Sequence, residues 1–134
     1  MAFKELPLGE VSLNPFTKLD KEWGLVAAGD AGASNAMTVS WGGMGTIWNK
    51  PVVTIYIRPQ RYTKQFVDGS DRFTLSFFDS QYKQADLVFV CRKLYADVIK
   101  PECFIDASVD EQNYPQRDHH TLYIAEVEHI YQHI

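Results

Sequence analysis

The stretch that decides the fold reads Asn35-Ala36-Met37-Thr38-Val39-Ser40-Trp41 and continues into two glycines. Large apolar side chains alternate in it with small ones. The large set is Met37, Val39 and Trp41, and the small set is Ala36, Thr38 and Ser40. A period of two places the two sets on opposite faces of a β-strand. We therefore expect a strand over residues 36–41 whose large side chains fill the core.

The opposite face of this strand is a candidate ligand surface. Its small side chains would let a planar molecule approach the backbone, and the Thr38 and Ser40 hydroxyls can donate or accept hydrogen bonds. A ring that carries both carbonyls and nitrogens would suit these groups. An ordinary half-exposed strand with a solvated polar face would show the same alternation.

Arg58 and Arg61 follow the end of a second apolar stretch, and Thr63 is a plausible N-cap of a short helix over residues 63–69. Two guanidinium groups beside a helix start could bind a phosphate through charge-assisted hydrogen bonds. Tyr62 could stack near such a ligand. The alternative is a solvated turn with exposed arginines.

Gly42, Gly43 and Gly45 suggest positive φ angles, a tight hairpin or a close backbone approach. They do not form a Gly-x-Gly-x-x-Gly motif. The segment after them continues into a strand instead of a helix, so the pattern excludes a dinucleotide site of the Rossmann type.

The rest of the chain is also rich in strand patterns. We expect strands over residues 24–28, 51–57, 72–78, 86–95 and 121–131, and residues 63–69 are the only helix that the pattern predicts. Six strands with one short helix predict an all-β protein with minor helix, an antiparallel barrel or sandwich. The 134 residues fit one domain over residues 1–134.

Composition narrows the function further. The net charge of −4 disfavours a nucleic-acid-binding protein, and no apolar run is long enough to span a membrane. Cys91 and Cys103 have neither a Cys-x-x-Cys spacing nor a preceding export signal, which favours two inert thiols in the cytoplasm. His129 and His133 lie four apart, but their surroundings favour strand over a helical metal site, so we expect no bound metal.

Taken together, residues 35–63 resemble the flavin reductase-like FMN-binding split-barrel family of the flavoredoxin type. The resemblance resumes through Val90-Cys91-Arg92-Lys93-Leu94-Tyr95 and His120-Thr121-Leu122-Tyr123-Ile124-Ala125. It implies a split β-barrel that forms a homodimer and binds FMN. Residues resembling 35–41 line the flavin in that family, those resembling 58–63 hold its phosphate, and His120 lies near the flavin and the dimer contact.

The resemblance also implies an oxidoreductase that moves hydride or electrons from NADH or NADPH through FMN to an acceptor, such as a partner protein. One family segment, which carries a Ser-Gly-Arg-Asp motif and helps to cover the flavin, is missing between the strands at 72–78 and 86–95. Residues 81–85 replace it. Two alternatives follow: a flavin-binding electron carrier without turnover, and a flavin-free split-barrel dimer. His119 and His120 are adjacent, so we expect one to face the site and the other to face solvent.

Overall fold

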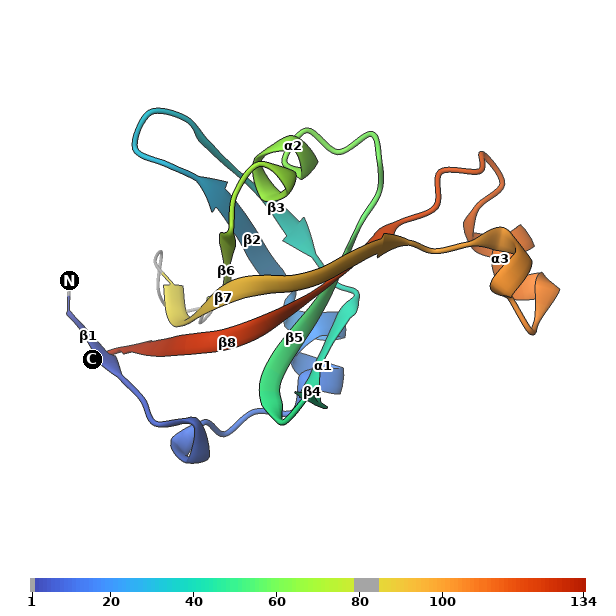
Figure 1. Ribbon diagram of the computed structural model, residues 1–134. Coiled ribbons are helices and arrows are strands. Elements are labelled where there is room, and N and C mark those ends of the chain that lie inside the picture. Colours follow the sequence, from blue (N-terminus) through green and yellow to red (C-terminus); the bar gives the residue numbers. More distant parts are fainter. Residues whose placement is uncertain (1, 79–84) are drawn as a thin grey trace.

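The computed structural model describes residues 2–78 and 85–134, which form an antiparallel sheet with short helices around it (Figure 1). The strands are β1 (Phe3–Glu5), β2 (Gly24–Gly29), β3 (Ser34–Val39), β4 (Gly42–Ile47), β5 (Lys50–Ile57), β6 (Arg72–Phe78), β7 (Ala85–Val98) and β8 (Thr121–His133). The all-β prediction is confirmed. The described residues contain two strands beyond the six expected, β1 and β4.

The strand order is β3-β2-β6-β7-β8-β5-β4, and β1 pairs with the far end of β8. The sheet therefore begins and ends at β3 and β4, two strands that are consecutive in the chain. Ser40 and Trp41 connect them. The opening of the sheet lies at this connection, and the predicted ligand strand β3 is one of its two edges.

The core confirms most of the predicted alternation. Met37 and Val39 of β3 are buried, as are Val53, Ile55 and Ile57 of β5. Along β6, Phe73, Leu75 and Phe77 are at most 2% exposed. Burial of these side chains supplies the main stabilisation of the fold, at about 1.5–3 kcal/mol for each large apolar side chain.

Trp41 is a correction to the prediction. Its side chain is 48% exposed, so it does not fill the core behind the ligand face. The reason is that β3 ends at Val39, and alternation no longer fixes the direction of a side chain in the connection to β4.

The predicted hairpin at the glycines is also wrong. Gly42, Gly43 and Gly45 lie inside β4, and the turn to β5 is made by Trp48 and Asn49, which have φ angles of 55° and 57°. These positive φ angles are typical of two-residue hairpin turns. The expected close backbone approach is present at Gly42, where a Cβ would lie 2.6 Å from the Thr54 carbonyl oxygen.

The helix predicted over residues 63–69 is confirmed as α2 (Lys64–Asp68), with Thr63 as N-cap and Gly69 as C-cap. It is not the only helix. The others are α1 (Pro15–Thr17), α3 (Ala107–Asn113), a π-helical turn η2 (Lys18–Glu22) and 3₁₀ turns η1 (Leu8–Glu10) and η3 (Pro101–Cys103). The structure describes no helix long and apolar enough to cross a membrane.

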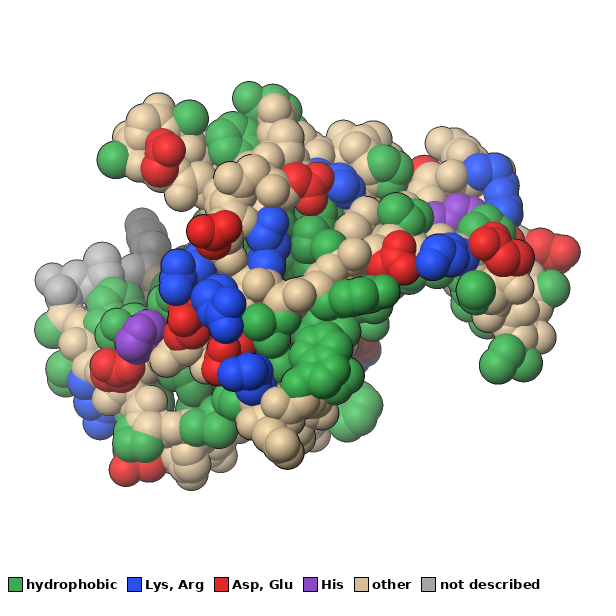
Figure 2. Space-filling view, in the orientation of Figure 1, with side chains coloured by type: hydrophobic (Ala, Val, Ile, Leu, Met, Phe, Trp, Pro, Cys, Tyr) green, Lys and Arg blue, Asp and Glu red, His purple; other side chains and the backbone are tan. Residues whose placement is uncertain are grey.

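The connection between β7 and β8 forms an arm that carries α3. In Figure 1 the two strands run on past the sheet, and α3 lies at the end of their extension. Figure 2 shows this arm standing out from the body, over a hollowed surface. The shortened connection at residues 81–85 lies outside the described residues, except for Ala85.

Candidate functional site

A pocket of about 280 Å³ lies at the opening of the barrel. We call it the strand pocket. It is lined by residues 37–41, Tyr56, Arg58, Arg61 and His120. Seven residues predicted from the sequence thus lie around one cavity: Met37, Thr38, Ser40, Trp41, Arg58, Arg61 and His120.

Sheet register explains why residues so far apart in sequence meet here. Ile57 at the end of β5 pairs with Thr121 at the start of β8. Arg58 follows the first and His120 precedes the second, so both leave the sheet at the same end. The turn after β3 reaches this end as well, because Ser40 and Trp41 lead into β4, the neighbour of β5.

Four predicted site residues do not line the strand pocket. Thr63 is 2% exposed, and its hydroxyl donates a 2.7 Å hydrogen bond to the side chain of Asn35. This bond ties the start of β3 to the start of α2. Ala36 is exposed on β3, and Tyr62 is 65% exposed with its ring packed edge-on against Phe66.

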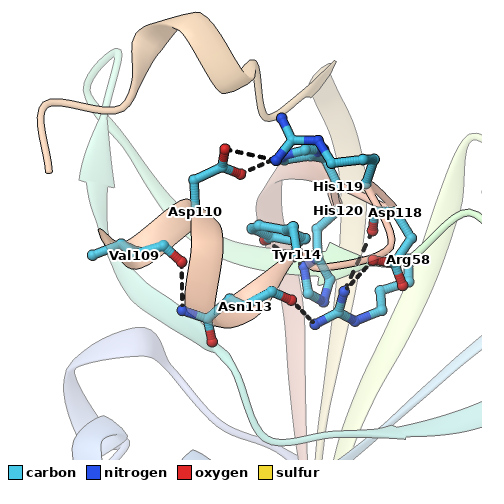
Figure 3. Close-up of polar contacts among 9 residues, drawn as sticks. Arg58, Val109, Asp110, Asn113, Tyr114, Asp118, His119 and His120 are labelled. Carbon is cyan, nitrogen blue, oxygen red and sulfur yellow. Dashed lines mark hydrogen bonds and ion pairs between the residues drawn. The ribbon is translucent and has the colours of Figure 1, made fainter. Parts of the chain in front are cut away.

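The Arg58 side chain already has protein partners. Its Nη1 lies 3.0 Å from Asp118 Oδ1, and its Nη2 donates a 3.1 Å hydrogen bond to the backbone carbonyl of Asn113. The guanidinium carbon lies 5.0 Å from the centre of the Tyr114 ring. Arg58 therefore ties the end of β5 to α3 while it lines the pocket (Figure 3).

Arg61 differs from Arg58. It is exposed, and the described part of the chain offers its guanidinium neither an ion pair nor a hydrogen bond. Asp118 is engaged elsewhere by Arg58 and by Gln60, whose amide donates a 2.8 Å hydrogen bond. These contacts, that from Gln60 foremost, keep the pKa of Asp118 below its usual value. Arg61 thus brings an uncompensated positive charge to the strand pocket.

The pKa of His120 is lowered to about 4, mainly because burial disfavours the charged ring and also because Arg58 lies nearby. The ring is therefore neutral at pH 7. Its Nδ1 lies 2.6 Å from the Tyr114 hydroxyl, and the Trp41 and Tyr56 rings lie nearby, with centres 5.3 and 6.4 Å from the centre of the imidazole.

His119 faces away from the strand pocket but does not face solvent, which corrects the expectation for the histidine pair. It is 7% exposed and stacks on Tyr114 with 4.3 Å between ring centres. Its Nε2 lies 2.6 Å from Asp110 Oδ1, and Arg117 contacts the other oxygen at 2.8 Å. Hydrogen bonds from Arg117 and then His119 lower the pKa of Asp110. The two histidines together fix α3 against the start of β8 (Figure 3).

A larger and more apolar pocket adjoins the strand pocket. It has a volume of about 680 Å³ and shares Ser40, Trp41, Tyr56 and His120 with it. Its remaining walls are α1 and η2, the start of β4, and the arm. We call it the α3 pocket.

Sequence reasoning missed Tyr56, Tyr114 and Asp118. Tyr56 alternates with buried Ile55 and Ile57, so the β5 pattern could have placed it on the ligand side. The helix that carries Tyr114 at its end could have been found from its N-cap. The Asp106 side chain there accepts a 3.0 Å hydrogen bond from the Ser108 amide.

The structure also describes the surroundings of His129, which was considered as a metal ligand, and of the two cysteines. His129 contacts Glu5 at 2.6 Å on paired strands, and within residues 2–78 and 85–134 no group of His, Cys, Asp or Glu side chains is arranged to hold a metal ion. Cys91 is fully buried and Cys103 is exposed.

Solved structures with the same architecture are flavin reductase-like FMN-binding split-barrel proteins. Flavoredoxin from Methanosarcina acetivorans superposes with a TM-score of 0.60 at 14% identity, covering 84% of this chain and 68% of its own. An FMN-binding domain of a flavin reductases-like enzyme from Shewanella baltica gives 0.58 at 14% identity, covering 98% and 77%. The styrene monooxygenase flavin reductase from Pseudomonas putida gives 0.58 at 15%, covering 81% and 77%.

No protein-family model matches the chain, and no curated protein matches it. The fold is therefore that of the FMN-binding split barrels, shared with flavin reductases at low sequence identity.

Proposed function

We propose that this protein is an FMN-binding oxidoreductase that moves hydride or electrons from NADH or NADPH through flavin to an acceptor. One observation carries the proposal: β3, the arginines after β5 and His120 converge on a pocket at the opening of a fold that FMN-binding proteins share. The residues present fit FMN. Thr38 and Ser40 offer hydroxyls on the face of β3 and its connection that has small side chains, and Arg61 offers a positive charge without a protein partner among the described residues.

Each residue would have a distinct task. Thr38, Ser40 and nearby backbone N–H groups would hydrogen-bond the flat ring and stabilise negative charge that develops there. Arg61 would bind the phosphate directly, and Arg58 would add positive charge while it holds α3. Bound FMN would supply hydride chemistry, and the protein would supply binding, orientation and exclusion of water.

His120 would act as a neutral hydrogen-bond donor in this site. Within the described residues, every buried side-chain nitrogen or oxygen has a hydrogen-bond partner. The hydrogen bond of His120 uses Nδ1, so Nε2 is its accessible nitrogen. Burial also raises the pKa of the Tyr114 phenol, so that group keeps its proton and can donate it to Nδ1. We assign the donor role in this hydrogen bond to the Tyr114 hydroxyl, which would place the proton of the neutral ring on Nε2, and the ring lines both pockets.

We further propose that the protein acts as a homodimer. Large apolar side chains are exposed along the arm and beside the pockets, including Val98 at 51%, Ile105 at 104% and Trp41 at 48%. Neighbouring exposed apolar groups favour a protein contact. Sedimentation of the purified chain as a monomer at micromolar concentration would contradict this part. A cytoplasmic location stays a prediction from the sequence.

A second candidate, a split barrel without flavin, is favoured by one observation. The Arg58 guanidinium is occupied by Asp118 and by backbone carbonyls of the arm, so of the two described arginines that line the strand pocket only Arg61 is free to meet a phosphate. An anaerobic titration with FMN, followed by NADPH and then NADH, separates the candidates. Flavin binding followed by bleaching supports the oxidoreductase, binding without bleaching supports an electron carrier, and no binding supports the flavin-free barrel.

The phosphate assignment has its own test. We expect Arg61→Ala to weaken FMN binding about 10- to 100-fold, because a charge-assisted hydrogen bond contributes about 1.5–3 kcal/mol. Arg72→Ala is the matched control, since Arg72 is an exposed arginine paired with Glu128 on the outside of the sheet. Equal FMN affinity of the two variants would remove Arg61 from the phosphate site.

A further inference from the structure

We infer that the α3 pocket binds a flat, uncharged aromatic molecule that carries one carbonyl oxygen. The binding itself goes beyond the proposed function. That this molecule is the electron acceptor rests on the proposed function.

The walls of the pocket indicate an uncharged aromatic ligand. Aromatic rings line it from several parts of the chain, including Phe16 of α1, Trp41 after β3 and Phe104 of the arm. Its volume of about 680 Å³ lies within the range of small-molecule sites, about 300–1,000 Å³. Stacking of a flat ring against such side chains contributes about 0.5–1.5 kcal/mol beyond its buried area.

The charges around the pocket argue against a phosphate or carboxylate as ligand. No lysine or arginine lines it, and its one charged lining side chain is the carboxylate of Asp20. Moving an anion into this pocket would remove water from it without providing a cation. Arg58 and Arg61 line the strand pocket instead, so the two cavities differ in the charge that they accept.

Polar side chains line the pocket at several places, with Asp20 and Asn113 away from the strand pocket and Ser40, Tyr56 and His120 where the two cavities meet. Ser40 and His120 line both cavities, and Tyr114 lies behind the His120 ring. The accessible Nε2–H of His120 would donate to a carbonyl oxygen at this junction. A ligand bound in this way has its apolar body between α1 and the arm and its oxygen next to the strand pocket.

Calorimetric titration with three neutral or anionic probes of similar size tests the inference. The probes are 2-acetylnaphthalene, 2-ethylnaphthalene and 2-naphthoate, each added to the full chain with and without saturating FMN. We expect 2-acetylnaphthalene to bind at least fivefold more tightly than 2-ethylnaphthalene and at least tenfold more tightly than 2-naphthoate. In His120→Phe, the preference for the ketone over the hydrocarbon should disappear.

Two substitutions on the arm locate the binding. Val109 lines the pocket and is 42% exposed on α3, whereas Ile105 is fully exposed on the same arm and does not line it. We expect Val109→Glu to weaken 2-acetylnaphthalene binding at least tenfold and Ile105→Glu to change it less than twofold.

Several results would overturn the inference: no ketone binding by the unsubstituted chain, tighter binding of the carboxylate, or equal affinities in the two arm variants. Competition by NADPH without FMN would also overturn it, because the pocket would then accept a phosphate-bearing ligand. Failure of FMN to bind, with ketone binding intact, would contradict only the proposed function.

Discussion

Acid should destabilise this protein through His120, and the effect can be isolated with one substitution. The pKa of His120 is about 4 in the folded chain, because burial and the nearby Arg58 disfavour the charged ring. In the unfolded chain it should be near 6.5. The unfolded state therefore binds a proton more readily, so the free energy of unfolding falls as pH drops from about 6.5 toward 4.

The size of the effect follows from the two pKa values. By proton linkage, these two pKa values lower the free energy of unfolding by about 2 kcal/mol between pH 7 and pH 5. Water that reaches the accessible Nε2 screens part of the cost of charging the ring, so we expect the free energy of unfolding to fall by about 1–2 kcal/mol. Asp118 acts in the opposite direction to Arg58 and keeps the ring from a larger shift.

Urea unfolding at pH 7 and pH 5 measures this loss. In His120→Gln, the amide oxygen can still accept a hydrogen bond from Tyr114, but nothing titrates, so the fall in unfolding free energy should be about 1–2 kcal/mol smaller. His129→Gln, at an exposed histidine, is the control and should keep the full His120 contribution. If unsubstituted chain and His120→Gln lose the same stability, the ring is not held neutral by its surroundings.

Two further predictions concern the body of the sheet. Gly42→Ala should lower the free energy of unfolding by about 1–3 kcal/mol, because the new Cβ would lie 2.6 Å from a β5 carbonyl oxygen. Gly43→Ala is the control: its new Cβ meets nothing within 4 Å, so the free energy of unfolding should change by less than about 0.5 kcal/mol, and thermal or urea unfolding compares the two variants. In native protein, a thiol reagent should modify the exposed Cys103 within minutes and leave Cys91 unmodified, since burial raises the Cys91 pKa to about 12. Equal labelling rates would contradict this.

The fold could be predicted from the sequence because most of its information is local. Alternation over β3, β5 and β6 indicates which side chains are buried. The observed bounds of β6, Arg72 and Phe78, are those that the alternation predicts. Prediction failed where alternation stops. Trp41 lies in a connection. The glycines of β4 resemble a turn in sequence, but only Gly42 is needed for a close approach to the neighbouring strand.

Sequence reasoning predicted only part of the site. The contacts of Arg58 that it did not predict change how the site is interpreted. The local motif supplies the strand and the arginines, but Arg58 bonds to Asn113 and Asp118, which are 55 and 60 residues away. No spacing rule connects such positions; sheet register does, by placing the ends of β5 and β8 together. Because this contact takes the Arg58 guanidinium toward α3, the same residue that suggests a phosphate site also fixes the wall of the apolar pocket. The two cavities are therefore built as one unit: loss of Arg58 should disturb both, and loss of Arg61 should disturb only the strand pocket.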